Sequence, residues 1–426
     1  MALIALLCFL LALTAPNATA ACDGDCGDDG EVTIDELILG IDIALGRARV
    51  DRCPSIDADG DGNIAVDEIV GAVDEAVNGC PPPEPRLIAF SRDGHVASLE
   101  IAPPWTVRAS GDLRNTVASA RCRAGRCLVV HPAPADSISI VDASDLSNED
   151  PIALERGADP RDVALVDDRT AVISQYGRAE LLVLDLVNGA TDSIDLGALA
   201  DADGLPEALR LASCGRRVFV QLRRVDHETD TPAPIGGGLG VIDLDRSPGD
   251  RVVDTDPKIP GIQAIALAGR PNFDMPVDCE AGVLYVAEPA PLFQGGGGYE
   301  QIDLAALTAS DLPIDTGAQV GGFEVVGPDQ YWIITHTDIG PGPSSHLNFI
   351  GGSVPDTYNT FALEHIDDLA FDRAENLLFF PDACFTGPTN PSCDSGIQVF
   401  RADTGERLTT ESIDLGFAPI EVVISR

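Results

Sequence analysis

The sequence predicts a mainly β protein, a seven-bladed β-propeller preceded by a small α-helical domain. Three observations support this fold class. A unit of short apolar strands and Gly-, Pro- and Asp-rich turns recurs from residue 86 to residue 426. Two acidic loops, each followed by an apolar-periodic helical segment, lie within residues 21–80. A proline-rich stretch at residues 81–85 separates the two regions and is stiff enough to act as a linker.

Residues 1–20 have the pattern of a secretory signal peptide. An apolar run extends from Ala2 to Leu13, and the small residues Ala18, Thr19 and Ala20 form a cleavage site. The run is shorter than the ~20 residues that cross a membrane, and no later segment qualifies. We therefore expect a secreted protein, extracellular or at the cell surface, with the periplasm and lipid attachment at Cys22 as alternatives.

The most specific motif lies at residues 57–68, where oxygen-bearing residues recur at every second position. Carboxylates stand at positions 1, 3 and 5, a backbone carbonyl is available at position 7, and a glutamate closes the loop at position 12. Gly62 at position 6 permits a sharp turn. This spacing is typical of the EF-hand loop, which surrounds Ca²⁺ with roughly six to eight oxygens, although acidic surface turns also use Asp and Gly. The expected ligands are Asp57, Asp59, Asp61, Asn63 and Glu68.

A second loop of the same length lies upstream, at residues 25–36. Position 3 is Gly27, which has no side-chain oxygen, so we expect this site to bind Ca²⁺ more weakly than the other. Its expected ligands are Asp25, Asp29, Glu31 and Glu36. Helical apolar stripes follow both loops: Leu37, Ile38, Ile41 and Leu45 after the first, and Ile69, Val70, Val73 and Val77 after the second.

Two loop-plus-helix halves without entering helices, within residues 22–80, resemble a dockerin-type tandem EF-hand module. The resemblance implies two calcium sites and a docking role, with a cohesin-like protein as the partner. This region holds sixteen acidic residues against three arginines. The whole chain carries a net charge of −42, which argues against nucleic acid and anionic membranes as partners.

Six copies of the recurring β unit can be read between residues 115 and 401, with several ending in an apolar-Asp pair. Their first strands begin near Asn115, Pro160, Leu205, Met275, Phe323 and Ile366. A seventh copy can be assembled from residues 420–424, 87–90 and 95–99, so that the first and last strands share one sheet. A sheet of this size cannot bury both faces alone, and radial packing closes a ring. A pair of β-sandwiches is the alternative fold.

Two phrases in the copy that begins near Pro160 carry a further resemblance. Residues 159–165 read Asp-Pro-Arg-Asp-Val-Ala-Leu, and residues 181–186 read Leu-Leu-Val-Leu-Asp-Leu. They are similar to the YVTN-type repeats of surface-protein and lactonase-like propellers. The resemblance implies a seven-bladed ring whose central region or loops bind the ligand.

The long insertions of the repeats fall in the loops that strand alternation places on one face. These loops span residues 226–238, 287–298, 338–346 and 382–395. A rigid scaffold with long loops on one face predicts a recognition surface there, for a protein or a glycan. Five side chains near that face offer a conceivable metal or acid–base site, although structural roles are the better interpretation: His131, His336, His365, Asp338 and Asp367.

Ten cysteines remain after residue 20, an even number that suits disulfides in an oxidising compartment. Cys122 with Cys127 and Cys384 with Cys393 flank single turns or loops and suit local bridges. Cys214 and Cys279 are then left as the fifth pair. Three pairings stay open for the remaining four: Cys22, Cys26, Cys53 and Cys80.

These observations predict a secreted calcium-binding protein that uses its propeller as a binding or adhesion scaffold for a surface protein or glycan. The alternative is a propeller hydrolase or lyase, of lactonase or polysaccharide-lyase type, that carries a dockerin-like docking module. Clustered His, Asp and Glu at the central channel would favour the enzyme, and scattered histidines would favour binding. A propeller with no ligand beyond its protein partner is a third option.

Overall fold

The computed structural model describes residues 22–27, 31–80, 84–148, 150–226, 231–232, 236–289, 297–314, 318–337, 344–351, 357–360, 366–383 and 395–426. The chain divides into two compact units, Met1–Glu84 and Pro85–Arg426, which are described separately below. Several predicted features lie outside the described residues: the signal peptide, Asp29, Asp338, His365, Cys384 and Cys393. Among the described residues, no helix combines the length and apolar character that a membrane crossing requires.

The first unit contains the only two α-helices of the described residues, α1 (Ile34–Ala44) and α2 (Val66–Asn78). Each begins inside the last positions of its acidic loop, as the sequence predicts. Two short 3₁₀ turns, η1 (Val50–Arg52) and η2 (Pro54–Ile56), connect them. The core is small, and Ile56 and Cys53 are fully buried at its centre. Disulfides Cys22–Cys80 and Cys26–Cys53 cross-link it, which resolves the pairing that the sequence left open.

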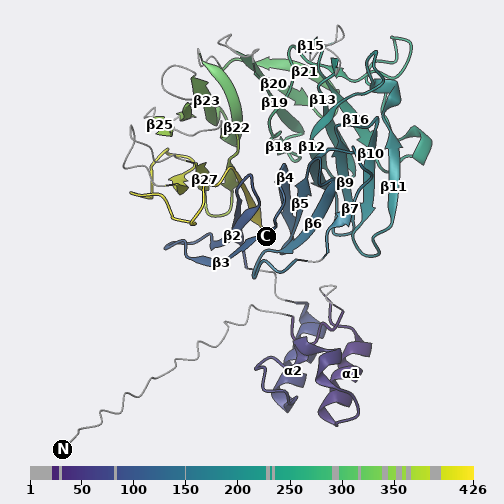
Figure 1. The fold of residues 1–426 in the computed structure, drawn as a ribbon, viewed down its shortest axis with the longest axis vertical. Helices are drawn as coiled ribbons and strands as arrows, with labels where there is room; N and C mark the ends of the chain where they lie inside the picture. The colour runs from purple at the N-terminus through teal and green to yellow at the C-terminus, as the bar shows by residue number, and fades with distance from the viewer. Residues whose placement is uncertain are drawn as a thin grey trace, which may run out of the picture. The chain divides into compact units, whose positions relative to one another are not determined.

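The second unit is a seven-bladed β-propeller (Figure 1). The first three sheets in chain order contain, from the innermost strand outward, β29 (Glu421–Ser425), β1 (Arg86–Phe90), β2 (His95–Glu100) and β3 (Val107–Asp112); β4 (Ser119–Arg123), β5 (Arg126–His131), β6 (Ser137–Asp142) and β7 (Ile152–Ala153); and β8 (Pro160–Leu165), β9 (Thr170–Gln175), β10 (Glu180–Asp185) and β11 (Thr191–Asp195).

The other four sheets follow the same order. They contain β12 (Ala208–Cys214), β13 (Arg217–Leu222), β16 (Gly238–Asp243) and β17 (Ile265–Ala266); β18 (Val277–Asp278), β19 (Val283–Pro289), β20 (Gly297–Asp303) and β21 (Thr308–Leu312); β22 (Gln319–Gly327), β23 (Gln330–Thr337), β24 (Ser344–Ile350) and β25 (Thr357–Thr360); and β26 (Ala370–Asp372), β27 (Leu377–Asp382) and β28 (Gly396–Arg401). A separate hairpin joins β14 (Val225–Asp226) to β15 (Thr231–Pro232).

The ring closes as the sequence predicts, because the last strand β29 pairs antiparallel with the first strand β1. Leu87 lies opposite Ile424, and Ala89 lies opposite Val422. The six internal copies also form the expected sheets, and the β-sandwich alternative is wrong. Several inner strands begin later than predicted: β4 starts at Ser119 and β26 at Ala370. The residues just before these strands lie outside the paired strands, and they border the central channel.

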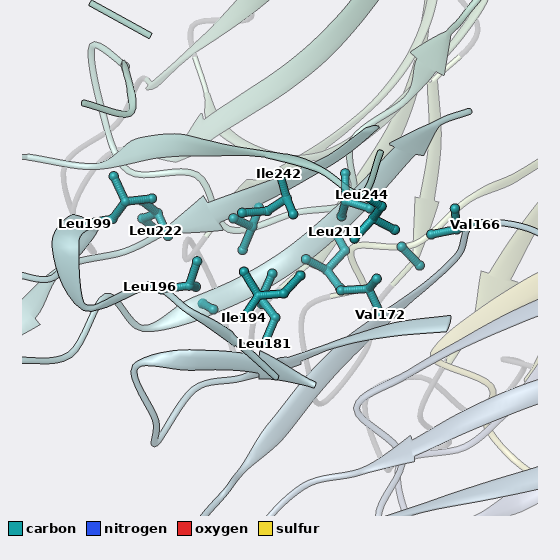
Figure 2. Packing of buried hydrophobic residues seen from close by; sticks show 14 residues of the cluster. Val166, Val172, Leu181, Ile194, Leu196, Leu199, Leu211, Leu222, Ile242 and Leu244 are labelled. Atoms are coloured by element: carbon teal, nitrogen blue, oxygen red, sulfur yellow. The ribbon is translucent and has the colours of Figure 1, made fainter. Parts of the chain in front are cut away.

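Each pair of neighbouring sheets encloses its own apolar cluster, so the described residues contain seven such clusters around the ring. Alternate residues of one strand therefore serve two interfaces. On β5, Val129 packs toward the preceding sheet and Leu128 toward the following one. Figure 2 shows one cluster, in which Leu181 and Ile194 meet Leu211 and Ile242. Continuous burial on both faces explains why single sheets are not independently stable.

Two disulfides of the propeller agree with the predicted pairs. Cys122–Cys127 bridges β4 and β5 within one sheet, and Cys214–Cys279 joins two neighbouring sheets. Disulfides are typical of proteins in oxidising compartments, which is compatible with the expected extracellular location.

Candidate functional site

The acidic loop at residues 57–68 folds so that its carboxylates converge. The side-chain oxygens of Asp57, Asp59 and Asp61 lie within 4.8 Å of one another. The Oδ2 atom of Asp57 accepts the Gly62 N–H at 2.8 Å, and Gly62 adopts a φ of +83°, a value that few residues other than glycine tolerate. Asp59 Oδ1 likewise accepts the Asp61 N–H, and Asp61 Oδ1 accepts the Asn63 N–H. A backbone N–H of the loop thus orients each aspartate, and the other carboxylate lone pairs remain available to a ligand.

Glu68 closes this loop from the first turn of α2. Its Oε1 atom accepts the Asp59 N–H at 3.3 Å, and its Oε2 atom accepts the Ala65 N–H at 2.7 Å. These bonds hold the carboxylate, which is buried, across the loop from Asp57. Helix α2 therefore fixes the position-12 carboxylate, as the motif requires of a ligand that binds through both oxygens.

The loop at residues 25–36 repeats this geometry where the structure describes it. Glu36 accepts the Gly27 N–H at 2.8 Å and the Thr33 N–H at 2.7 Å. Burial alone would raise the pKa of Glu36, but its hydrogen bonds from Thr33 and Gly27 bring that pKa below the usual value. Asp25 is buried and Glu31 is exposed, and Asp25 Oδ1 accepts the Gly27 N–H at 3.2 Å.

A single carboxylate oxygen in this loop indicates that its residues suit a cation. Asp57 Oδ1 is buried and has no hydrogen-bond donor among the described residues. A buried carboxylate oxygen without a partner costs free energy, which a bound cation would offset. Carboxylates at three alternate positions plus a closing glutamate are the oxygen ligands that Ca²⁺ prefers, so the residues present fit this ion.

Both helices also carry an exposed apolar stripe. The described chain exposes ten large apolar side chains. Eight of them lie on α2 or on α1 and its C-cap residue Leu45, at identical spacing: Ile34, Ile38, Ile41 and Leu45, and Val66, Val70, Val73 and Val77. Positions i, i+4, i+7 and i+11 share one helix face. The far side of each helix carries a buried core residue, Ile43 or Ala72, and Leu37 and Ile69 at the edge of the stripes pack on the same core. The predicted stripes therefore divide between core and surface.

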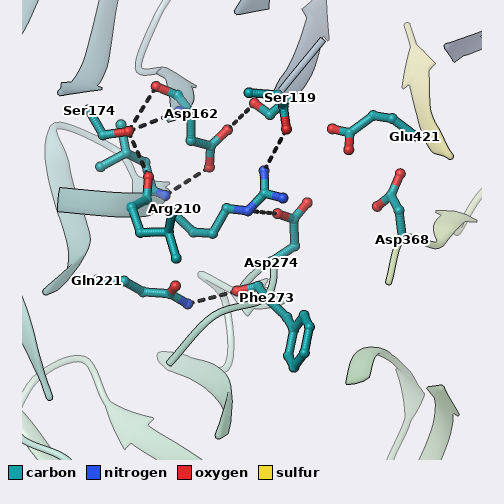
Figure 3. A network of polar contacts seen from close by, with 12 residues as sticks. Ser119, Asp162, Ser174, Arg210, Gln221, Phe273, Asp274, Asp368 and Glu421 are labelled. Atoms are coloured by element: carbon teal, nitrogen blue, oxygen red, sulfur yellow. Dashed lines mark hydrogen bonds and ion pairs between the residues drawn. The ribbon is translucent and has the colours of Figure 1, made fainter. Parts of the chain in front are cut away.

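A polar network drawn from several inner strands lies in the propeller's central channel (Figure 3). Arg121 lies at its centre, with Nη2 at 2.7 Å from Asp274 Oδ2 and at 3.2 Å from Asp162 Oδ2. The Nε atom of Arg210 lies at 3.3 Å from Asp274 Oδ1. Burial would raise the pKa of Asp274, but the two guanidinium groups lower it.

Three acids of this network bond to the backbone of the next inner strand. Asp162 accepts the Leu211 N–H at 2.8 Å, Glu421 accepts the Ala120 N–H at 3.1 Å, and Asp368 accepts the Val422 N–H at 2.5 Å. The sheets are thereby connected in sequence around the channel. These bonds give Asp162 and its counterparts a structural role as well as a charge.

Glu421 and Asp368 remain close to other acids. Burial raises the pKa of Glu421 to about 7, with Arg210 and Arg121 opposing this shift and Asp274 adding to it. Burial and the charge of Glu421 raise the pKa of Asp368 as well. The channel therefore holds a carboxyl group, that of Glu421, which can exchange a proton near neutral pH.

A cavity of about 440 Å³ opens above this network. Its wall includes Arg92, Tyr176 and Arg223, which follow the second strands of their sheets, and Thr116, which precedes an inner strand. The loops that follow second strands and the loops that precede inner strands lie on the same face, where the long insertions were expected. Arg121, Asp274 and Glu324 line a second cavity, of about 300 Å³.

Among the described residues, the structure brings together one pair of the predicted histidine and aspartate residues, His336 and Asp367. His336 Nε2 lies 2.6 Å from Asp367 Oδ1, and its Nδ1 lies 3.1 Å from Ser345 Oγ. His131 instead contacts Ser139 Oγ and the Thr116 carbonyl. Both histidines are buried.

Sequence reasoning missed the arginine and carboxyl groups of the channel. Arg121, Arg210, Asp274 and Glu421 belong to four different repeats, and no fixed spacing relates them. The one available signal was the presence of charged residues at the start of otherwise apolar strand patterns, as in Arg161 and Asp162.

No family model matches the chain, and no curated protein matches it in sequence. Its fold is similar to solved structures of two candidate 6-phosphogluconolactonases. The one from Bacteroides fragilis gives a TM-score of 0.54 at 11% identity, over 80% of this chain and 98% of the other. The one from Bacteroides uniformis gives 0.54 at 12% identity, with the same coverage. At such low identity the similarity establishes the fold, a seven-bladed propeller with lactonase-like structural neighbours.

Proposed function

We propose that this chain is a secreted calcium-binding docking protein. Residues 22–80 attach it to a partner protein, and the propeller serves as a binding or adhesion scaffold for a surface protein or glycan. The observation that carries the proposal is the duplicated apolar stripe, which directly follows two carboxylate loops of matching geometry.

Calcium has a structural role in this proposal. A bound ion neutralises the carboxylates of each loop, whose repulsion otherwise opposes the folded form. Glu36 and Glu68 connect each loop to the first turn of its helix. Ordering the loops in this way fixes the two helices and hence the two stripes.

The exposed apolar stripes on the two helices favour a folded protein as the binding partner. Side chains such as Ile34, Val66 and Val77 are 75%, 80% and 76% exposed, and contiguous apolar surface of this kind marks an interaction site. The two helices present the same spacing 32 residues apart, so a partner can meet either one in the same way. Because the region carries thirteen more acids than arginines, we expect basic residues around the apolar patch of the partner, which the dockerin resemblance makes a cohesin-like domain.

Surface plasmon resonance of the full-length protein on an immobilised cohesin domain tests this proposal. We expect binding in calcium and its loss in EGTA. Ile38→Asp and Val70→Asp alone each leave one stripe intact and lower affinity about twofold, whereas the double variant lowers it by roughly 100-fold. Val187→Asp, which alters a side chain 74% exposed on the propeller, is the matched control.

Binding that survives EGTA, or a double variant that binds like the wild type, contradicts the docking role. Failure of the wild type to bind the cohesin domain also contradicts this partner class. Sedimentation of the same samples distinguishes self-association as the use of the stripes. Circular dichroism confirms that each variant keeps its helices.

A second candidate function is a propeller hydrolase or lyase. The observation that favours it is Glu421, whose pKa of about 7 suits proton transfer near neutral pH and which lines the channel cavity with Asp368. The Ser345, His336 and Asp367 array is not a nucleophilic site, because Ser345 is fully buried and its Oγ accepts the Ile366 N–H. Turnover of lactones or polyuronates that Glu421→Gln abolishes would support the enzyme, and its absence would leave the scaffold role.

A further inference from the structure

The cavity at the channel mouth has a charge pattern unlike the rest of the chain. Four arginines line it, Arg92, Arg161, Arg210 and Arg223, in a protein whose net charge is −42. Its volume of about 440 Å³ lies within the usual range of small-molecule sites. Cationic side chains gathered in one concave place indicate an anionic ligand.

Two of these arginines, Arg161 and Arg223, have a donor that the described residues leave unsatisfied. Arg161 Nη2 donates to Asp159 at 2.6 Å, and its guanidinium lies over the Tyr176 ring, 5.2 Å from the centroid. The Nε–H groups of Arg161 and Arg223 are buried and have no hydrogen-bond acceptor among the described residues. Pre-oriented guanidinium groups with spare donors suit a carboxylate or phosphate, which they bind in planar pairs.

Arg223 also lies beside a second guanidinium. Arg270 Nε donates to the Arg223 carbonyl at 3.1 Å. Burial and the positive charge of Arg223 lower the pKa of Arg270. An anion at Arg223 would reduce this repulsion between like charges.

The floor of the same cavity carries carboxyl groups. Asp367 is 34% exposed, and Asp368 and Glu421 lie next to it in the wall. Figure 3 shows Glu421 and Asp368 turned toward the Arg210–Asp274 pair. Carboxyl oxygens accept hydrogen bonds from hydroxyl groups and repel a second negative charge.

We infer that the channel mouth binds an acidic sugar, with its carboxylate on the arginines and its hydroxyl groups on the carboxyl groups of the floor. A cation would be repelled by the arginines, a neutral sugar would leave their donors unused, and a polyanion would meet the acids. The inference rests on the proposed binding role of the propeller and names the ligand class of that scaffold.

Isothermal titration calorimetry of the full-length protein with D-galacturonate, D-galactose and inorganic phosphate tests it. We expect galacturonate to bind at least tenfold more tightly than either of the other two. Arg223→Gln lowers its affinity at least tenfold. Arg216→Gln, which changes an exposed arginine paired with Asp167 and Asp245, leaves the affinity unchanged.

If galactose binds with the same affinity as galacturonate, the arginines do not bind the sugar carboxylate. Phosphate that binds as well overturns the role of the floor, and no binding of galacturonate overturns the inference as a whole. The docking of the helical unit is measured separately on a cohesin surface, so either idea can fail alone. Tryptophan fluorescence, which arises from Trp105 and Trp332 in the propeller, verifies that Arg223→Gln keeps this unit folded.

Discussion

Glu36 and Glu68 accept hydrogen bonds from the same two positions of their respective loops. Each carboxylate takes one N–H from the third loop residue, Gly27 or Asp59, and one from the ninth, Thr33 or Ala65. The two loops are therefore structural repeats, although Gly27 has no side-chain ligand to offer. Each glutamate stands in the first turn of a helix, so each helix is tied to the loop before it in the same way.

Removal of calcium should destabilise the helical unit and spare the propeller. The repulsion among the converging carboxylates returns on chelation, and an ion at 100 times its dissociation constant contributes about 2.7 kcal/mol. Both tryptophans lie in the propeller and both described α-helices lie in residues 22–80. We expect EGTA to lower the melting temperature followed by circular dichroism at 222 nm and to leave tryptophan fluorescence unchanged.

The same melts contain their control. The Glu36→Gln/Glu68→Gln variant should already melt early and respond little to EGTA. If EGTA leaves the melting temperature of the wild type at 222 nm unchanged, calcium does not have the proposed structural role.

Asp162→Asn should weaken the propeller. The Asp162 carboxylate accepts the Ser119 hydroxyl at 2.5 Å and the Leu211 N–H at 2.8 Å, besides its ion pair with Arg121. An amide has one acceptor oxygen and no charge, so we expect a loss of roughly 2–4 kcal/mol in the free energy of unfolding. Urea denaturation followed by tryptophan fluorescence measures it.

The control for this variant is Asp185→Asn. Asp185 pairs with Arg169, whose side chain is 64% exposed, and solvent screens such a pair, so we expect this substitution to lower the free energy of unfolding far less than Asp162→Asn does. Equal effects of the two substitutions would contradict a special role for the channel network.

The stability of the propeller should fall as pH rises toward 8, because of Glu288. Burial, together with the hydrogen bond and negative charge of Glu300, raises the pKa of Glu288 to about 8 from an ordinary value of 4.5. Between these pH values the folded protein retains a proton that the unfolded chain releases, so stability is greatest below the lower value and declines through this window. Glu288→Gln removes this decline and should stabilise the protein at pH 8 by roughly 2 kcal/mol.

Chemical denaturation at pH 5 and at pH 8 compares the two proteins. The exposed Glu280 provides the control, and Glu280→Gln should keep the pH dependence of the wild type. If Glu288→Gln shows the same decline as the wild type, the carboxyl pair is not its source.

Local patterns in the sequence were sufficient for much of this fold. Short β-branched runs between turns predicted the sheets, and the runs at residues 87–90 and 420–424 predicted the ring closure that Ala89 and Val422 form. The loop at residues 57–68 was predictable because its candidate ligands are neighbours in the chain.

Features that depend on distant residues were not predictable in the same way. Leu37 and Ile38 are adjacent and equally apolar, yet Leu37 packs on the core and Ile38 is 52% exposed. Which face a helix buries depends on what packs against it. Likewise, Arg121 meets Asp274 only because seven inner strands converge, and one sequence contains no record of that convergence.

We propose that the two loops, which share one geometry, bind calcium with unequal strength. Isothermal titration calorimetry of the full-length protein with CaCl₂ tests it most directly. We predict two sites, with the tighter one lost in Glu68→Gln and the weaker one lost in Glu36→Gln. No binding by the wild type, or two sites that persist in the double variant, would contradict the account.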